Sequence, residues 1–371
     1  MTGFAFEVID RDGDARTGRL LTPHGVVDTP AFMPVATYGA VRGVAASELE
    51  QLGSQILLSN TYHLEERPGS GVIAGLGGLH SFTGWRRPWL TDSGGYQVTS
   101  LAHKLQLDEQ GVTFASPIDG RRRLLTPEGA IKSQENLGSD IAMVLDECVP
   151  KDPSDGSTAR LRSAAERTMR WAERSAQARQ RADQAVFGIV QGGTDPALRA
   201  WSASALVGLG FEGFAHGGLG LGEEPDQRID MVAVANAVIP AAAPRYLMGL
   251  GYPADLVNGV AAGVDLFDCV IPSRHGRHGV LFTGLGVLQI RNAQFRDDPE
   301  PPDADCDCPT CARHSRAYLR HLFQTREALG ARLATVHNLR FYMRLLERVR
   351  AAIAEGTFAA LMSHINEVPA R

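Results

Sequence analysis

Eight short apolar segments recur along the chain, and this recurrence restricts the possible folds more than any other feature of the sequence. The segments cover residues 31–37, 55–60, 89–92, 141–147, 186–191, 213–219, 245–250 and 264–270. Continuous apolar runs of this length are typical of strands buried on both faces of a parallel sheet. Most of the gaps between them contain helical patterns, and several of these open with proline, which suits a first helical turn. The clearest such patterns cover residues 47–52, 157–182, 196–209, 225–238 and 253–262.

Eight strand–helix units predict an α/β fold, specifically a (β/α)8 TIM barrel. A chain of 371 residues with 44% hydrophobic residues is large enough to bury such a core. A doubly wound sheet of five or six strands is the alternative, but it leaves some of the apolar segments unplaced.

Three further segments lie outside the strand–helix pattern of the predicted barrel. Residues 4–28 contain two alternating stretches around Asp12-Gly13-Asp14, which indicate an N-terminal hairpin. Residues 98–124 resemble a hairpin inserted after the third strand. Residues 290–345 carry a cysteine cluster and separate the eighth strand from a closing helix expected near 338–354. With no linker or low-complexity segment, we expect residues 1–371 to form a single catalytic domain that includes a zinc-binding subdomain at about 290–345.

The charge balance excludes binding to nucleic acid through overall electrostatic attraction. The chain has 37 basic and 42 acidic residues and a net charge of −5, so only local basic clusters could contact an acidic partner. No apolar run is long enough to span a membrane, and no basic-then-apolar leader opens the sequence. We therefore expect a cytoplasmic protein. Five cysteines in a chain without a leader argue against a disulfide framework.

Polar side chains follow most of the predicted strands at the point where each strand ends. Asp92, Asp146 and Asp268 end the third, fourth and eighth strands, and Gln191 ends the fifth. Since catalytic groups of barrels come from the C-terminal ends of strands, we expect these side chains to face one pocket. Asp268 is followed by Pro272 and by a predicted glycine-rich loop that carries Arg274 and Arg277. Taken alone, this aspartate would be expected merely to cap a turn. The recurrence of acids around the ring favours a function instead.

This set of side chains suits chemistry at a sugar bonded to a purine. Of two separated carboxylates, one can attack an anomeric carbon while the other transfers a proton. A third carboxylate beside an amide can accept hydrogen bonds from the N–H groups of a guanine-like base, while the amide donates one to the carbonyl oxygen of that base. Tyrosine and methionine, such as Tyr96 and Met248, can enclose the plane of a base.

The cysteine cluster predicts a structural metal site. Cys306, Cys308 and Cys311 lie within six residues, and His337 follows. Three thiolates and one imidazole form a closed tetrahedral zinc site. By spacing alone, His314 and His321 compete with His337 as the fourth ligand.

Several motifs occur along the chain in the order in which one family has them. In these motifs the chain resembles the bacterial tRNA-guanine transglycosylases, also called queuine tRNA-ribosyltransferases. The matching motifs are TDSGGYQ at 91–97, DEC at 146–148, GIVQGG at 188–193, YLMG at 246–249, FDCV at 267–270 and the Cys/His cluster. The resemblance extends from about residue 4 to residue 345.

The resemblance implies a zinc-containing TIM barrel, usually a homodimer, that acts in queuosine biosynthesis. Such an enzyme exchanges the wobble guanine of tRNAs with G-U-N anticodons for 7-aminomethyl-7-deazaguanine. By match, Asp268 is the nucleophile that forms a covalent intermediate with the ribose, and Asp92 is the general acid and base.

The remaining site residues are also assigned by the resemblance. Asp146, Gln191 and the Gly218 N–H would bind the edge of the base, with Tyr96 and Met248 stacking on it. The Leu219 carbonyl, oriented by Glu223, would meet the aminomethyl group. Leu221 and Cys148 fill space that eukaryotic relatives leave for the larger base queuine. Arg274 and Arg277 would contact the anticodon loop, and Cys306, Cys308, Cys311 and His337 would hold Zn²⁺, one ion per subunit.

Three histidines depart from the usual pattern of the family, namely His216, His275 and His278. Three other functions compete with base exchange on this tRNA. A paralogue could act on DNA or another RNA, and a non-catalytic tRNA-binding subunit could share the fold, although it should have lost its acids. A glycoside hydrolase barrel would need neither the purine-binding pair nor the zinc subdomain.

Overall fold

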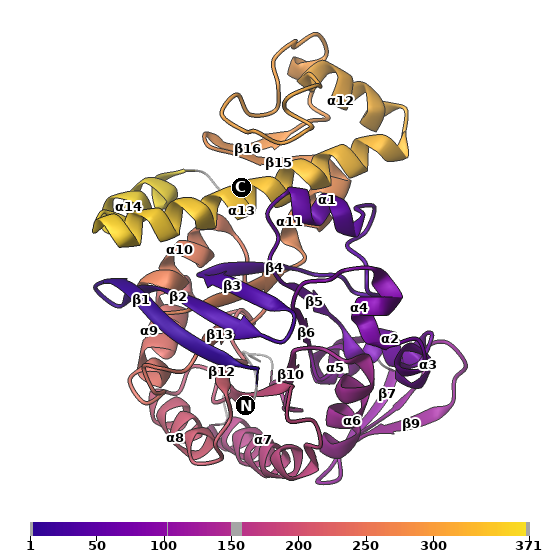
Figure 1. Ribbon diagram of the computed structural model, residues 1–371, viewed down its shortest axis with the longest axis vertical. Coiled ribbons are helices and arrows are strands. Elements are labelled where there is room, and N and C mark those ends of the chain that lie inside the picture. The colour runs from indigo at the N-terminus through magenta and orange to yellow at the C-terminus, as the bar shows by residue number, and fades with distance from the viewer. Residues whose placement is uncertain (1–2, 102, 150–157, 369–371) are drawn as a thin grey trace.

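The computed structural model describes residues 3–101, 103–149 and 158–368, and its centre is a barrel of eight parallel strands (Figure 1). The strands run in the order β4-β14-β13-β12-β11-β10-β6-β5, each parallel to its neighbour. A parallel bridge between Val35 and Leu58 joins the two ends of this sheet, and the Ala36 N–H donates to the Leu58 carbonyl at 2.7 Å. The predicted TIM barrel is therefore confirmed.

Each of the eight predicted apolar segments contains one barrel strand. The strands are β4 (Ala31–Pro34), β5 (Leu57–Ser59), β6 (Trp89–Thr91), β10 (Ile141–Met143), β11 (Ala185–Val190), β12 (Gly213–His216), β13 (Arg245–Leu247) and β14 (Leu266–Cys269). Seven are shorter than predicted, because residues at the ends of those segments, mainly the last ones, leave the sheet; β5 and β14 also begin two residues late. The remaining strand, β11, begins one residue earlier than predicted, at Ala185. Apolar side chains such as Met33, Leu58 and Ile189 fill the core.

Helices cover the outside of the barrel (Figure 1). Those between the strands are α1 (Ala46–Gln51), α2 (Thr61–Glu66), α3 (Ser70–Gly75), α4 (Gly78–Thr83), α5 (Gly95–Leu101), α6 (Pro127–Leu137), α7 (Thr158–Ala178), α8 (Pro196–Val207), α9 (Pro225–Asn236) and α10 (Pro253–Ala261). Pro196, Pro225 and Pro253 occupy first turns, as the sequence predicted. Residue 157, where the predicted pattern before the fifth strand began, lies outside the described residues. Among the helices that the structure describes, none combines the length and the apolar character needed to cross a membrane.

A three-stranded antiparallel sheet lies at the N-terminal end of the barrel. It consists of β1 (Ala5–Asp12), β2 (Ala15–Thr22) and β3 (Gly25–Thr29), so the predicted hairpin gains a third strand. Arg16 in β2 is fully buried and binds Asp265, the residue before β14, through Nε at 2.9 Å and Nη2 at 2.5 Å. Phe4 packs edge-on against Phe187 of β11. The sheet thus closes the end of the barrel at which the strands begin.

The segment inserted after β6 is also larger than the predicted hairpin. Its strands are β7 (His103–Leu107), β8 (Val112–Ala115) and β9 (Arg122–Leu125), which form a second antiparallel sheet in the order β7-β8-β9. The strands β8 and β9 correspond to the predicted hairpin.

The C-terminal region follows β14 and includes the segment with the cysteines. Its elements are α11 (Ile271–His278), β15 (Val280–Thr283), β16 (Gly286–Gln289), the 3-10 helix η1 (Ala293–Phe295), α12 (Arg316–Gln324), α13 (Ala328–Glu355) and α14 (Phe358–Glu367). In Figure 1, α13 runs between the barrel and the part formed by β15, β16 and α12. The closing helix begins at Ala328, ten residues earlier than predicted.

The arginine-bearing segment after β14 differs from the sequence interpretation, which made it a glycine-rich loop. It forms the helix α11 and packs against α13. A Cβ atom on Gly276 would lie 2.7 Å from the Thr335 backbone nitrogen. The glycine therefore allows two helix backbones to approach closely, rather than making the segment flexible.

Candidate active site and metal centre

The first carboxylate of the site, Asp92, follows β6 directly and is held by its neighbours in the chain and in space. Its Oδ1 accepts hydrogen bonds from the backbone N–H of Thr61 at 2.9 Å and of Gly94 at 3.2 Å. Its Oδ2 accepts from the amide groups of Asn60 and Gln97. Burial raises the pKa of Asp92 to about 6 against these hydrogen bonds, and the charge of Asp268 adds to the rise. A carboxyl group with this pKa can both donate and accept a proton near neutral pH.

The second carboxylate, Asp146, lies beyond the end of β10 and pairs with an amide. The Gln191 Nε2 donates to Asp146 Oδ2 at 2.6 Å, and both residues are buried. Burial raises the pKa of Asp146 to about 6, opposed by the bond from Gln191 and supported by the charges of Asp92 and Glu147. The sequence-predicted pair is thus brought together across two neighbouring strands.

Two glycines after β12, Gly217 and Gly218, lie so close to this pair that a side chain on either would collide with Gln191. A Cβ atom on Gly217 would lie 2.7 Å from Gln191 Nε2, and one on Gly218 would lie 2.4 Å from Gln191 Oε1. The Gly218 backbone also contacts the Cys148 thiol, whose pKa burial raises to about 12. A neutral thiol and an amide therefore lie against Gly218, and the Asp146 carboxyl group lies against Gly217.

The third carboxylate, Asp268, lies near the end of β14 and is held through one of its two oxygens. Its Oδ1 accepts hydrogen bonds from the Tyr246 hydroxyl at 2.6 Å and the Gly249 N–H at 2.7 Å. Both bonds that it accepts from described residues end on this atom, so Oδ2 is the oxygen left for a ligand. Burial raises the pKa of Asp268, while the two hydrogen bonds lower it in part.

Glu223 organises the loop that follows β12. It accepts hydrogen bonds from the backbone N–H groups of Gly220 and Leu221, and Arg228 binds it at 2.7 Å. Burial opposes ionisation of Glu223, but these contacts outweigh it and lower its pKa. Leu219, the residue just before these two amides, is therefore held in one backbone conformation.

Tyr96 and Met248 follow strands on opposite sides of the barrel, β6 and β13, and they differ in exposure. Tyr96 lies in α5, directly after the Asp92 loop, and is 53% exposed. Met248 follows β13 directly and is partly buried against the barrel core. Both side chains therefore remain accessible to a ligand at the C-terminal edge.

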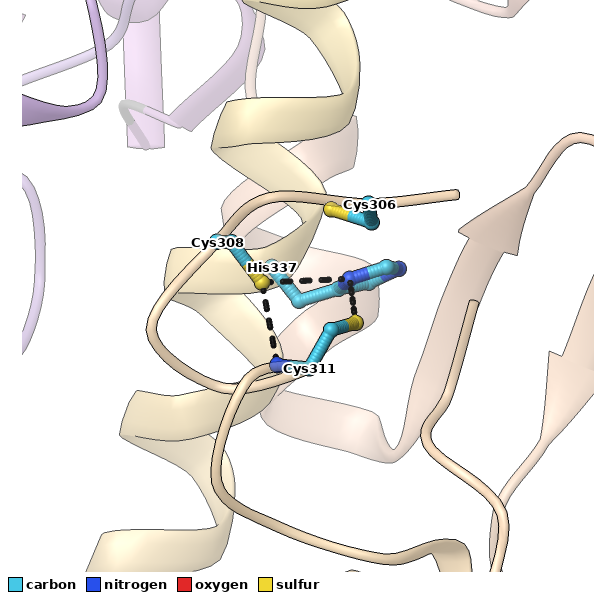
Figure 2. A group of neighbouring side chains, drawn as sticks. All are labelled: Cys306, Cys308, Cys311 and His337. Carbon is cyan, nitrogen blue, oxygen red and sulfur yellow. Dashed lines mark hydrogen bonds between the residues drawn. The ribbon is translucent and has the colours of Figure 1, made fainter. Parts of the chain in front are cut away.

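Cys306, Cys308, Cys311 and His337 converge beside α13, and they form a set that could hold a metal ion (Figure 2). The His337 Nδ1 lies 3.6 Å from the Cys308 sulfur and 3.2 Å from the Cys311 sulfur. His337 Nε2 lies 2.7 Å from the Phe282 carbonyl oxygen, which can only accept a hydrogen bond. The proton is therefore on Nε2, and the lone pair of Nδ1 points at the thiols, as in histidines that bind metals. This geometry selects His337 over His314 and His321.

The comparison with known proteins agrees with this site. The family model described as queuine tRNA-ribosyltransferase matches residues 10–369. The chain belongs to this family. Curated members named queuine tRNA-ribosyltransferase are 51% identical in Herpetosiphon aurantiacus over 98% of this chain and 92% of that protein, and 51% identical in Thermus thermophilus over 96% and 92%. A third, from Pseudomonas syringae pv. tomato, is 50% identical over 96% of both chains. Membership makes the chain an enzyme, a tRNA-guanine transglycosylase.

In this member of the queuine tRNA-ribosyltransferase family, Arg274 and Arg277 both lie on α11. These are the two arginines that the sequence predicts to contact RNA. Burial lowers the pKa of Arg277, and the positive charges of Arg42 and Arg274 lower it further. Arg42 comes from the loop after β4 and therefore adds a third cation to the two identified in the sequence. The adjacent histidines have internal partners, since His275 stacks on Phe282 and the His278 ring nitrogen lies 2.7 Å from the Arg274 carbonyl.

The unusual His216 has a structural partner that the sequence did not indicate. It is fully buried in β12, 3.4 Å from the guanidinium of Arg199, which itself donates to the Gly217 carbonyl at 2.7 Å. Burial lowers the pKa of His216 well below its usual value, and the charges of Arg199 and Arg245 lower it further. The imidazole of His216 is therefore neutral, so it does not repel the Arg199 guanidinium, which binds the Gly217 carbonyl in the loop after β12. Asn60 and Arg199 were missed because no motif marks them, and Tyr246 was given no role although it opens the YLMG motif. Only long-range contacts show what these three residues do.

Proposed function

We propose that this enzyme exchanges the wobble guanine of tRNAs with G-U-N anticodons for 7-aminomethyl-7-deazaguanine by double displacement at the ribose C1′. The observation that carries the proposal is the asymmetric binding of Asp268. Tyr246 and Gly249 hold Oδ1, so Oδ2 is oriented and available as a nucleophile.

In the first step, Asp268 Oδ2 attacks C1′ and forms a carbon–oxygen bond. The C1′–N9 bond breaks, its electron pair goes to guanine, and Asp92 supplies the proton that guanine needs to leave as a neutral base. A pKa of about 6 for Asp92 supports this role, because a useful fraction is protonated near neutral pH.

In the second step, the incoming base attacks C1′ through its ring nitrogen and gives the proton on that nitrogen to Asp92. The bond between C1′ and Asp268 breaks, which restores both carboxyl groups. Atoms and charges balance, and no redox cofactor is consumed. The step resembles deglycosylation in retaining glycosidases, with a purine-like base in place of water.

Recognition of the base rests on the pair of Asp146 and Gln191. An ionised Asp146 can accept two N–H groups of a guanine edge, while the Gly218 N–H and the Gln191 amide can donate to the base carbonyl. Both bases share this edge, so one site can release guanine and bind its replacement. Tyr96 and Met248 would lie on the two faces of the base, and the Leu219 carbonyl, fixed through Glu223, would accept from the aminomethyl group. Leu221 and Cys148 would limit the size of the substituent.

For the tRNA, we propose that Arg274 and Arg277 bind the phosphates of the anticodon loop beside Arg42. Single-stranded loops allow a base to be turned out into such a pocket. A few local cations are compatible with a net charge of −5, and they make binding sensitive to salt. We further propose that structural Zn²⁺ is held by Cys306, Cys308, Cys311 and His337.

We also propose that the enzyme is cytoplasmic and forms a homodimer. Sedimentation analysis can measure the oligomeric state.

The test is incorporation of radiolabelled guanine into unmodified tRNA with a G-U-N anticodon. The wild type should incorporate label and form a protein–RNA adduct that survives denaturing electrophoresis. Asp268→Asn should do neither while still binding tRNA, and Asp226→Asn, in the first turn of α9, serves as the matched control. Adduct formation by Asp268→Asn would remove Asp268 from the nucleophile role. No incorporation by folded, zinc-loaded wild type would favour a paralogue acting on DNA or other RNA, or a non-catalytic subunit.

A further inference from the structure

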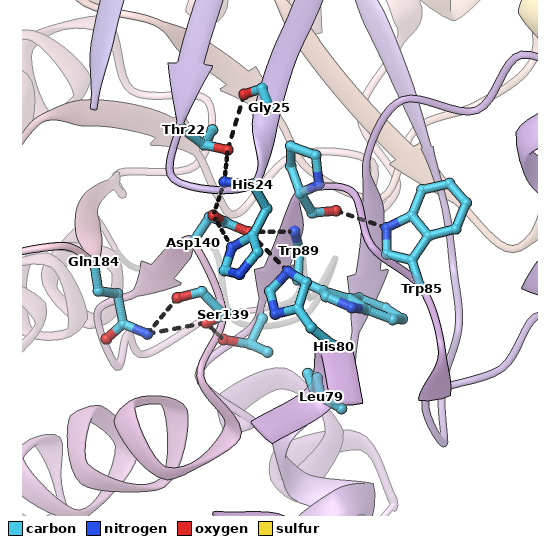
Figure 3. Close-up of polar contacts among 12 residues, drawn as sticks. Thr22, His24, Gly25, Leu79, His80, Trp85, Trp89, Ser139, Asp140 and Gln184 are labelled. Atoms are coloured by element: carbon cyan, nitrogen blue, oxygen red, sulfur yellow. Dashed lines mark hydrogen bonds and ion pairs between the residues drawn. The ribbon is translucent and has the colours of Figure 1, made fainter. Parts of the chain in front are cut away.

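A second group of metal-ligating side chains lies at the opposite end of the barrel from the carboxylates. It consists of His24, His80 and Asp140, which come from three distant segments (Figure 3). His24 lies in the turn between β2 and β3, His80 lies in α4, and Asp140 directly precedes β10. No step of the proposed reaction uses this group.

Both imidazoles face the same carboxylate. His24 Nδ1 lies 2.8 Å from Asp140 Oδ1, and His80 Nε2 lies 3.3 Å from Asp140 Oδ2. One ligand atom from each residue lies within 4.8 Å of the other two. Neighbouring ligands in a tetrahedral zinc site with nitrogen and oxygen donors are separated by about 3.3–3.6 Å, given bonds of about 2.0–2.2 Å. The observed spacing needs only small adjustments to match.

One ring nitrogen of His80, Nε2, lacks a hydrogen-bond partner. The His80 side chain is 9% exposed, and Nε2 is buried; it lies 3.3 Å from Asp140 Oδ2 as an ion-pair contact but makes no hydrogen bond. Buried polar atoms without partners are rare, and a missing ion is one ordinary explanation. The atom points toward the carboxylate, so an ion placed there would satisfy it.

The charge state of the group also suits a cation. The rings of His24 and His80 stack with centroids 3.4 Å apart and planes 16° apart. Burial opposes ionisation of Asp140, but the His80 ring, the Trp89 N–H and His24 outweigh it and lower its pKa.

We propose that His24, His80 and Asp140 bind a divalent transition-metal ion such as Zn²⁺, separately from the Cys/His site. Two imidazoles and one carboxylate form a three-ligand set, and water can supply the fourth ligand because the His24 side chain is 37% exposed. The same exposure allows the His24 ring to tilt away from the stack, which brings both lone pairs onto one ion. The ion would fasten the β2–β3 turn to α4 and to the start of β10.

Titration of the full-length, zinc-loaded protein with Co²⁺ tests this proposal. We expect one additional equivalent of Co²⁺, with visible d–d absorption but without the thiolate-to-cobalt charge-transfer band that the cysteine site would produce. The same addition should raise the melting temperature of the wild type. His24→Gln should weaken binding at least tenfold and abolish the thermal shift.

The variants are chosen so that the fold survives. Glutamine at position 24 keeps the backbone N–H that lies 3.2 Å from Asp140 Oδ1. His80→Gln should have the same effect on Co²⁺, and the exposed His364→Gln in α14 should have none. No additional equivalent in the wild type, or equal binding by His24→Gln, would overturn the proposal. These readouts do not depend on base exchange, so they are independent of the proposed reaction.

Discussion

The Tyr246 hydroxyl lies 2.6 Å from Asp268 Oδ1, and this bond ties the seventh strand of the barrel to the proposed nucleophile on the eighth. The hydroxyl is buried, and burial together with the charge of Asp268 raises the pKa of Tyr246 well above its usual value. Tyr246 therefore stays protonated and donates to Asp268 at neutral pH.

Replacement of Tyr246 by Phe should lower kcat for guanine exchange by about tenfold to a hundredfold. A hydrogen bond to a charged group contributes about 1.5–3 kcal/mol, and its loss leaves the carboxylate less well oriented. Because this bond lowers the pKa of Asp268, its removal should also move the acid limb of the rate profile to higher pH. Rates measured between pH 5 and pH 9 on the variant and on Tyr318→Phe, at an exposed tyrosine in α12, test both effects. An unchanged profile would contradict the assigned role.

Activity of the wild type should fall as the medium becomes acidic. Asp146 has a pKa of about 6 and must be ionised to accept the N–H groups of guanine. Its ionised fraction is therefore present above pH 6 and is lost below it. Asp92, with the same pKa, must also be ionised to accept the proton of the incoming base, so kcat/KM for guanine should drop at least tenfold between pH 7 and pH 5. Filter binding of tRNA at both values separates this effect from loss of RNA affinity. A flat profile down to pH 5 would show that Asp146 is not titrating as described.

Replacement of Cys308 by Ser should lower the zinc content and the melting temperature together. Cys308 is buried beside His337, and removal of one thiolate from a closed four-ligand site weakens the metal that holds this segment folded. Elemental analysis and a thermal melt measure both quantities. Cys148→Ala, which changes a thiol near the base site, should retain full zinc. Full metal content in Cys308→Ser would show that the ligand assignment is wrong.

Replacement of Leu221 by Gly should increase the use of queuine relative to the aminomethyl base. The Leu221 side chain is partly buried in the loop that Glu223 organises, and its removal would provide room for a larger substituent. Competition between the two bases measures the preference. Leu285→Gly, at a side chain that is 95% exposed, should leave it unchanged. A variant with the wild-type preference would exclude Leu221 as the residue that limits pocket size.

Much of the barrel could be predicted because strands buried on both faces must be apolar throughout. That requirement marked all eight strands and, with them, the positions at which Asp92, Asp146 and Asp268 follow. The sheets and helices outside the barrel were predicted less completely. The strands β3 and β7 were not predicted, because they lie in sheets with exposed faces, where the pattern is weaker. The helix α11 was taken for a loop because glycine is frequent there. Gly276 is required by contact with Thr335, which no local pattern reports.

By itself, the sequence determined the order of strands and helices, the family and the chemical types at the strand ends, because these depend on local patterns and on motifs along the chain. The tertiary structure alone decided which partners those groups meet. It selected His337 through the Phe282 carbonyl, assigned Tyr246 to Asp268, and brought His24, His80 and Asp140 together. Such contacts join residues far apart in the chain, and only the closed barrel fixes their distances.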